Sequence, residues 1–228
     1  MSGNAKGNDY MTQSAEKNET AGKPGLVLHA ATTYDLLIWL VTLGRERAFR
    51  EKMLGLAHLK PGESVLDIGC GTGSLAIAAK SQVGPTSTVC GLDASPEMIA
   101  RAEMKARKAR VDVGFKNAFA QSLPFPAAQF DVVLTTIMLH HLPRKSRAEL
   151  ASEIRRVLKP GGRVLAIDFG ATARSRKSFL DHFHRRHGRV EFKEIIALFN
   201  DAALDIAESG AVEMRDLEFV LATLPCCA

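Results

Sequence analysis

Three glycines and one carboxylate stand close together in the stretch VLDIGCGTGSLA, residues 65–76. Gly69, Gly71 and Gly73 lie between two apolar runs, and Asp67 comes two residues before the first of them. Glycine lets the backbone adopt conformations that other residues avoid, and lets a ligand approach the main chain closely. A turn of this composition between a strand and a helix therefore indicates a ligand site at the helix N-terminus.

Two kinds of ligand use such a turn. A dinucleotide places its pyrophosphate there under the spacing G-x-G-x-x-G, but here the third glycine position holds Ser74. Asp67 would repel a pyrophosphate, whereas it would attract an ammonium or sulfonium group, and S-adenosylmethionine carries both. The residues thus disfavour an NAD-dependent oxidoreductase and favour an S-adenosylmethionine site.

A second carboxylate, Asp93, follows Gly73 by 20 residues and ends the next apolar run. At the carboxyl end of a strand, an aspartate can accept hydrogen bonds from both hydroxyls of a ribose. This feature suits NAD as well as S-adenosylmethionine, so it indicates a nucleoside without choosing between them.

The elements that position these residues alternate along the chain. Strand patterns are each followed by a helical pattern or a turn, which predicts a parallel sheet with helices on both faces. Ser95 and Pro96 are typical of a helix start, Ser95 as the N-cap. The expected strands are 64–69, 87–93, 111–118, 130–139, 162–170, 204–212 and 217–224, and the expected helices after the glycine turn are 74–82, 95–109, 146–158 and 191–202.

The segment before the turn differs in composition. Residues 1–25 are polar without an apolar period and are expected to form a disordered arm. Residues 26–60 have apolar positions at helical spacing and predict a helical N-terminal cap of two helices, ahead of a domain over residues 61–228. Its longest apolar stretch, 36–41, is far shorter than the roughly 20 residues that cross a bilayer.

Composition is that of a globular protein, with 46% hydrophobic and 24% charged residues and a net charge of +5. The four cysteines, Cys70, Cys90, Cys226 and Cys227, have no metal-site or disulfide spacing, so no metal is expected and a reducing compartment, the cytoplasm, fits best.

Five motifs together resemble the class I S-adenosylmethionine-dependent methyltransferases, above all small-molecule members such as the ubiquinone and menaquinone C-methyltransferases. The motifs are VLDIGCGTG, GLDASPEMI, SLPFPAAQFDVV, MLHHLP and LKPGGRVLAIDF, between about residues 61 and 170. The resemblance implies an α/β fold, a Rossmann-like doubly wound sheet of seven strands that is mostly parallel with an antiparallel last strand. It also implies an enzyme that transfers a methyl group to a small-molecule acceptor.

The resemblance further implies roles for individual residues. Phe119 stands where the family commonly has an aspartate for the adenine amino group, so adenine recognition is expected to depend on main chain, Asn117 or Gln121. The implied cofactor-binding residues are Asp67, Gly69, Gly71 and Gly73 at the methionine end, Asp93 at the ribose, Ala94 and Met98 at an adenine edge, Asn117, Ala118 and Phe119 after the third strand, Thr135 in the fourth, and Tyr34 as a cap over the cofactor.

His140 and His141 are the candidate catalytic residues, because they follow the fourth strand near the expected position of the methyl group. Methyl transfer needs mainly alignment, and a base is required only when the acceptor carries a proton that must leave. His140 is favoured as the residue nearer the strand. In the alternative, one histidine bonds the turn that leads to Pro143 and the other is exposed.

Acceptor recognition is predicted in residues 173–189, where basic and histidine side chains interleave with Phe179, Leu180 and Phe183 at helical spacing. This pattern fits a lid over an acceptor that is anionic and partly apolar, or a surface helix with a solvated basic face. A protein or RNA methyltransferase and a non-catalytic S-adenosylmethionine-binding regulator are the alternatives. The sequence TTIM after the fourth strand, in place of an NPPY-type tetrapeptide, favours a small acceptor.

Overall fold

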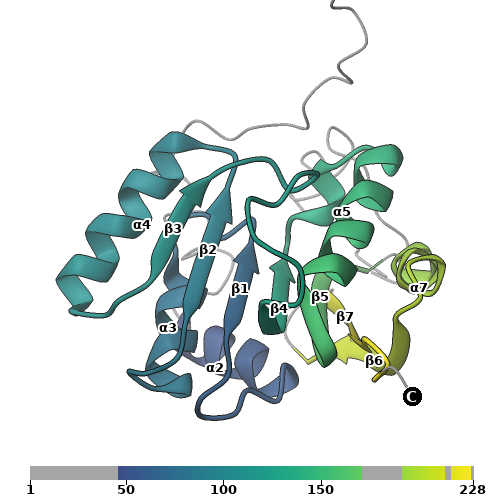
Figure 1. The fold of residues 1–228 in the computed structure, drawn as a ribbon, viewed down its shortest axis with the longest axis horizontal. Coiled ribbons are helices and arrows are strands. Elements are labelled where there is room, and N and C mark those ends of the chain that lie inside the picture. Colours follow the sequence, from purple (N-terminus) through teal and green to yellow (C-terminus); the bar gives the residue numbers. More distant parts are fainter. Residues whose placement is uncertain (1–45, 171–191, 214–216, 227–228) are drawn as a thin grey trace, which may run out of the picture.

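A seven-stranded sheet organises the chain in the computed structural model, which describes residues 46–170, 192–213 and 217–226 (Figure 1). The strands stand in the order β3-β2-β1-β4-β5-β7-β6. Their bounds are β1 Val65–Ile68, β2 Val89–Asp93, β3 Gly114–Asn117, β4 Phe130–Thr136, β5 Leu158–Phe169, β6 Asp205–Val212 and β7 Leu217–Thr223. The helices are α2 Glu46–Leu56, α3 Ser74–Val83, α4 Pro96–Ala109, α5 Arg144–Val157 and α7 Phe192–Asp201, with a short 3-10 helix, η1, at Leu139–His141.

Strand directions agree with the prediction. Strands β1 to β5 pair in parallel, whereas β7 pairs antiparallel with both β5 and β6. The doubly wound sheet with an antiparallel last strand is therefore confirmed. Strand β1 is central, with β2 and β3 on one side of it and β4, β5, β7 and β6 on the other. The strand order therefore changes direction at β1, and ligands bind at this point in open parallel sheets.

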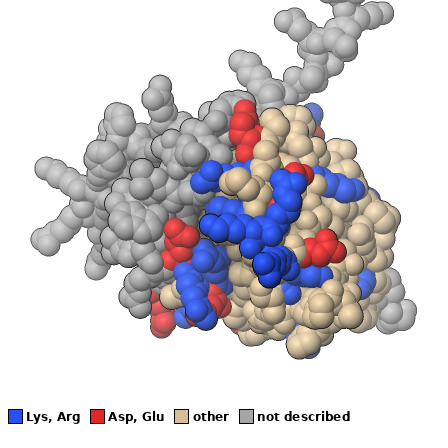
Figure 2. Space-filling view, turned by 90° about the vertical axis from the view of Figure 1, so that its left-hand side faces the viewer, with Lys and Arg blue, Asp and Glu red and all other residues tan. Residues whose placement is uncertain are grey.

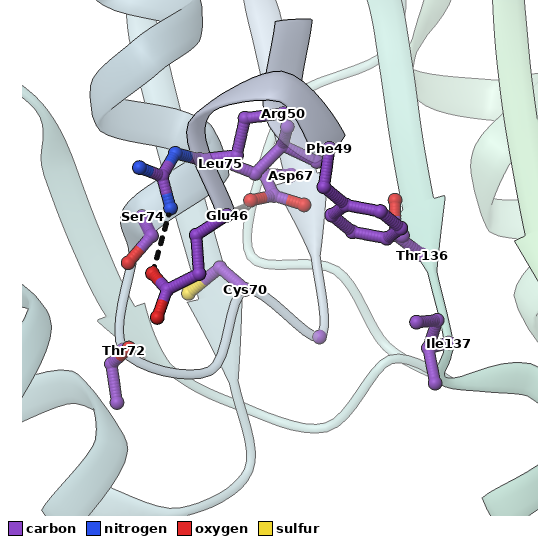
Figure 3. A pocket seen from close by; sticks show the side chains of 11 residues that line it. Glu46, Phe49, Arg50, Asp67, Cys70, Thr72, Ser74, Leu75, Thr136 and Ile137 are labelled. Carbon is purple, nitrogen blue, oxygen red and sulfur yellow. Dashed lines mark hydrogen bonds and ion pairs between the residues drawn. The ribbon is translucent and has the colours of Figure 1, made fainter. Parts of the chain in front are cut away.

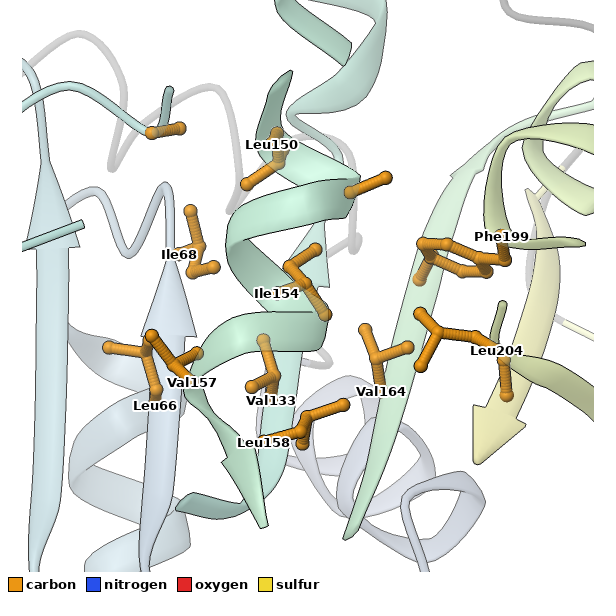
Figure 4. Close-up of a cluster of buried hydrophobic side chains, with 14 of the residues drawn as sticks. Leu66, Ile68, Val133, Leu150, Ile154, Val157, Leu158, Val164, Phe199 and Leu204 are labelled. Carbon is orange, nitrogen blue, oxygen red and sulfur yellow. The ribbon is translucent and has the colours of Figure 1, made fainter. Parts of the chain in front are cut away.

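Both faces of the sheet are covered by helices, as Figure 1 shows. Successive residues of a strand point to opposite faces, so Val65 packs into one apolar cluster with α2 and α3, while Leu66 packs into the other with α5 and α7. Figure 4 shows the second cluster, in which Leu150 and Ile154 of α5 lie over the strands. Burial on both faces explains why these strands are apolar throughout.

One local prediction needs correction. A helix was expected over 146–158 and a strand from 162, but β5 begins at Leu158. Leu158 pairs with Phe130 and the next pair is Val132 with Arg163, so the pairing register shifts across residues 159–162 of this strand. Gly161 adopts a φ of 75° there, a conformation that suits glycine.

Helix α2 is part of the same core as the sheet. Its residues Met53 and Leu54 are 0% and 4% exposed and pack into the cluster that includes Val65 and Leu165. The first predicted helix, with Tyr34, and the basic segment 173–189 lie outside the described residues, so the division into arm, cap and domain remains an interpretation. Among the helices that the structure describes, none has the length and apolar character to cross a membrane.

Basic side chains gather on the side of the molecule that carries α4 (Figure 2). Arg107, Lys108 and Arg110, at the end of this helix, are exposed. Lys105 instead turns toward the glycine turn, where its Nζ donates hydrogen bonds to Oγ1 of Thr72 at 2.7 Å and Oγ of Ser74 at 3.1 Å. Helix α4 thus supports the turn that follows β1.

Candidate active site

The three glycines of the turn all have positive φ angles, 71° at Gly69, 51° at Gly71 and 75° at Gly73. A Cβ atom on Gly69 would lie 2.5 Å from Cγ of Met138, and one on Gly73 would lie 2.7 Å from Cβ of Ala102. At Gly69 and Gly73 other residues are therefore disfavoured by both conformation and space. Gly73 is also the N-cap of α3 and supplies no side chain to its first N–H groups, which favours a ligand at this helix end.

Asp67 is a buried carboxylate in β1, beside the turn, and is 2% exposed. Its Oδ2 atom has no hydrogen-bond partner among the described residues, while the backbone N–H of Ala76 bonds the carboxylate. Burial, with a smaller contribution from the charge of Asp93, raises the pKa of Asp67 to about 7. A buried carboxylate with an unused oxygen stabilises a cation, so this position fits an ammonium or sulfonium group.

Asp93 ends β2 beside the same turn. Its Oδ2 accepts a hydrogen bond from the N–H of Gly71 and its Oδ1 accepts one from the N–H of Ser95, both at 2.9 Å. Burial raises the pKa of Asp93. Hydrogen bonds from the backbone N–H groups of Ser95, Gly71 and Ala94 partly counteract this shift. Asp93 therefore shapes the turn, and each carboxylate oxygen retains a lone pair for a further donor.

The residues after β3 join Asp93 at this edge of the sheet. The side-chain amide of Asn117 and the backbone N–H of Ala118 both donate to the Asp93 carbonyl, at 2.9 and 3.1 Å. Phe119 is 51% exposed, so its ring is accessible for stacking on a ligand. Met98 differs, because it is 2% exposed and packs into the interior.

Thr135 and Thr136 of β4 point to opposite sides. Thr135 is fully buried, whereas Thr136 borders the pocket with Ile137, and its Oγ1 has no partner within the described ranges. The structure thus places Thr136, rather than Thr135, beside Asp67. Strand alternation counted from Val132 and Leu134, which pack toward α2, would have indicated Thr136.

A pocket opens between the glycine turn, β4 and α2 (Figure 3). Asp67, Gly69, Cys70, Thr72, Ser74 and Leu75 line it from β1, the turn and α3, and Glu46, Phe49 and Arg50 line it from α2. Sequence reasoning missed the three α2 residues. A signal was present, since Glu46 and Arg50 are spaced for an ion pair across one helical turn. Burial raises the pKa of the Cys70 thiol well above its usual value, which suits a packing role.

His140 and Asp168 form a buried pair at the carboxyl ends of β4 and β5. Their side chains are 5% and 1% exposed, and Nδ1 of His140 lies 2.7 Å from Oδ1 of Asp168. The rings of His140 and His141 lie 3.9 Å apart, and Phe169 contacts His140 edge to face. An ionised Asp168 carboxylate only accepts, so in that state the Nδ1–H of His140 donates to it and Nε2 keeps the free lone pair. Sequence reasoning named His140 as a candidate but did not name Asp168.

Comparison with known proteins adds to this geometry. Residues 65–162 match the family described as methyltransferase domain. The ubiquinone/menaquinone biosynthesis C-methyltransferase UbiE of Ralstonia pickettii (strain 12J) is 37% identical over 158 residues, which are 69% of this chain and 64% of that protein. UbiE of Burkholderia mallei (strain SAVP1) is 36% identical with the same coverage. The chain thus spans about two thirds of the length of these relatives, 64%.

On these matches the chain resembles the class I S-adenosylmethionine-dependent methyltransferases. Solved structures share the fold of this chain. A SAM-dependent methyltransferase from Aquifex aeolicus superposes with a TM-score of 0.68 at 21% identity, covering 85% of this chain and 98% of that one. Geranyl diphosphate C-methyltransferase from Streptomyces coelicolor A3(2), in complex with S-adenosyl-L-homocysteine, superposes with a TM-score of 0.64 at 16% identity, covering 80% and 81%.

Proposed function

We propose that this chain transfers the methyl group of S-adenosylmethionine to a small-molecule acceptor. The observation that carries the proposal is Asp67, a buried carboxylate with an unpartnered oxygen that lines the same pocket as the glycine turn. When bound, S-adenosylmethionine supplies a methyl group already activated by its sulfonium. The protein then contributes mainly alignment and exclusion of water.

The residues present fit this cofactor. Asp67 neutralises positive charge at the methionine end, and the backbone of Gly69, Gly71 and Gly73 allows close approach. Asp93 accepts from the ribose hydroxyls. The adenine edge is assigned to the main chain and side chains around β2 and β3, namely Ala94, Asn117, Ala118 and Phe119, with Met98, Thr135 and Tyr34 as the remaining candidates.

His140 is the proposed base for the acceptor. Its Nε2 takes the proton that leaves the acceptor, while Asp168 holds the ring and stabilises the positive charge that the ring then carries. A base of this kind is needed for a carbon or phenolic oxygen that loses a proton, and the names of the UbiE relatives specify C-methylation. We therefore infer an acceptor of this class, anionic and partly apolar if residues 173–189 contribute to its binding.

Binding to the purified chain tests the cofactor assignment. Calorimetry with S-adenosylmethionine, S-adenosylhomocysteine and NAD should show micromolar affinity for the first two and no binding of NAD. Binding of NAD alone would overturn the assignment.

Transfer itself is tested with methyl-labelled S-adenosylmethionine added to a cell extract together with the chain. After separation by mass, the label should appear in the low-molecular-weight fraction. Label in the protein or RNA fraction would instead support the alternative of a macromolecular substrate, and absence of label from every fraction would support a non-catalytic regulator.

A further inference from the structure

Helix α2 brings an ion pair to the wall of the pocket. Nη1 of Arg50 lies 3.0 Å from Oε2 of Glu46, one helical turn away, and the two side chains are only 26% and 31% exposed. Both line the same pocket as Asp67, as Figure 3 shows. The pocket therefore has an anionic group in β1 and a cationic group on α2.

Packing fixes the position of this cation. Met53 and Leu54, three and four residues after Arg50, are buried against the sheet, so the same side of α2 faces inward at Arg50. The segment after the helix is also anchored, because Arg163 of β5 donates to the carbonyls of Ala57 at 2.7 Å and His58 at 2.6 Å. The Arg50 guanidinium is thereby kept near the pocket.

The amino-acid end of the cofactor carries two opposite charges, an ammonium and a carboxylate. Asp67 matches only the first of them. A guanidinium matches the second, because its planar set of donors can bind both oxygens of a carboxylate. Of the residues that line this pocket, Arg50 is the one basic side chain among those the structure describes.

We propose, on the basis of the proposed function, that Arg50 binds the carboxylate of the cofactor's amino-acid end and exchanges its partner Glu46 for it. In the ligand-free chain, Glu46 holds the guanidinium at the pocket wall. The incoming carboxylate then replaces the Glu46 carboxylate, whose single contact with Arg50 is at Nη1, and binds the guanidinium through both of its oxygens. Glu46 competes with the ligand carboxylate for Arg50, so the charge of Glu46 weakens binding of the cofactor.

Calorimetry with two ligands isolates this interaction. S-adenosylmethionine and its decarboxylated analogue, in which a propylamine replaces the amino acid, differ only in the carboxylate. Arg50→Gln should weaken binding of S-adenosylmethionine by about tenfold or more, the range of a charge-assisted bond, and change that of the analogue by less than about twofold. Glu46→Gln should strengthen binding of S-adenosylmethionine and leave that of the analogue unchanged.

The matched control is Arg47→Gln. Arg47 forms an ion pair of the same spacing with Glu51 on the same helix, at 2.8 Å, but its side chain is 89% exposed. This variant should bind both ligands as the parent does, and thermal unfolding of all three variants checks that α2 remains folded. If Arg50→Gln affects both ligands equally, or neither, Arg50 does not bind the carboxylate. If Glu46→Gln weakens S-adenosylmethionine binding, the exchange is wrong.

Failure of the cofactor assignment in the proposed function would give a different result. In that case the parent chain binds neither S-adenosylmethionine nor its analogue. The other outcome is that the parent binds both ligands and Arg50→Gln keeps the parent's difference in affinity between them. This result would leave the proposed function intact and overturn only the role of Arg50.

Discussion

His140 and Asp168 join the carboxyl ends of two neighbouring strands through a bond of 2.7 Å between Nδ1 and Oδ1. The same carboxylate accepts the backbone N–H of His140 at 3.1 Å and that of Phe169 at 2.8 Å. Three donors from two segments thus hold Asp168, and Asp168 in turn holds the imidazole. A ring fixed in this way, with one nitrogen committed, is preorganised to exchange a proton at the other.

Replacing this pair should impair transfer without impairing cofactor binding. With S-adenosylmethionine saturating and the acceptor identified, His140→Gln should lower turnover by about 10²–10⁴-fold, the usual contribution of a general base. Asp168→Asn should lower turnover by about tenfold or more because the ring loses its orienting acceptor. Calorimetry should show that both variants keep the cofactor affinity of the parent.

His58→Gln is the control for these variants. His58 also contacts a carboxylate, with Nε2 2.8 Å from Oε1 of Glu208, but this pair is about half exposed, whereas the pair of His140 and Asp168 is buried. Turnover of this variant should match the parent. Losses below about threefold in both His140→Gln and Asp168→Asn would exclude proton transfer by this pair.

Cofactor affinity should depend on pH through Asp67. The pKa of this carboxyl is raised to about 7, so below pH 7 it is mostly neutral and attracts a cation less. Affinity for S-adenosylmethionine should therefore rise between pH 6 and pH 8, by up to about tenfold per unit below the pKa, and then level off. Titrations at pH 6, 7 and 8 measure this. Asp67→Asn should bind weakly and without this pH dependence; a parent chain with constant affinity would contradict the role of Asp67.

The same carboxylate should reduce the stability of the ligand-free chain. Its pKa is 3.8 in the reference state and about 7 in the fold, so ionisation disfavours folding progressively as the pH rises through this window. Asp67→Asn should thus be more stable than the parent at pH 8, by at most about 4 kcal/mol for a shift of this size, and similar to it near pH 4. Urea unfolding of the parent and of Asp67→Asn at both pH values gives the difference in their free energies of unfolding. The same difference at pH 4 and pH 8 would contradict the raised pKa of Asp67.

Asp93 should serve the nucleoside half of the ligand. Asp93→Ala removes a charge-assisted contact and should cost about 1.5–3 kcal/mol of S-adenosylmethionine affinity. Methylthioadenosine, which lacks the amino acid, should lose affinity by a similar factor, whereas Arg50→Gln should not affect it. Because Asp93 also accepts from Gly71 and Ser95, Asp93→Asn is the milder variant that retains one acceptor. Unchanged affinity in Asp93→Ala would exclude the ribose contact.

Gly73 should not tolerate a side chain. In Gly73→Ala a methyl group would meet Ala102 and the ring of Phe115 at a φ of 75°, so stability should fall by about 1–3 kcal/mol. Gly55→Ala is the control, because Gly55 lies within α2 with nothing within 4 Å of a built Cβ. This variant should be more stable by about 0.5–1 kcal/mol. Equal effects at the two sites in thermal unfolding would contradict the steric argument.

Local chemistry explains what could be predicted from the sequence. Ser95 was expected to be the N-cap of a helix, and its hydroxyl accepts the N–H of Met98 at 3.3 Å. The strands that contain Asp67 and Asp93 also lie where their apolar patterns predicted them. Such features depend on residues a few positions apart, since a cap, a turn or a buried strand is specified by its own side chains.

Tertiary structure decided which distant residues meet. The direction of Thr136 into the pocket depends on strand alternation relative to α2, and the pairing of His140 with Asp168 depends on β5 lying beside β4. Arg50 reaches the site only because α2 packs over the turn. These contacts follow from sheet order and helix packing, which are set by the whole core, so the short patterns around each residue do not specify them.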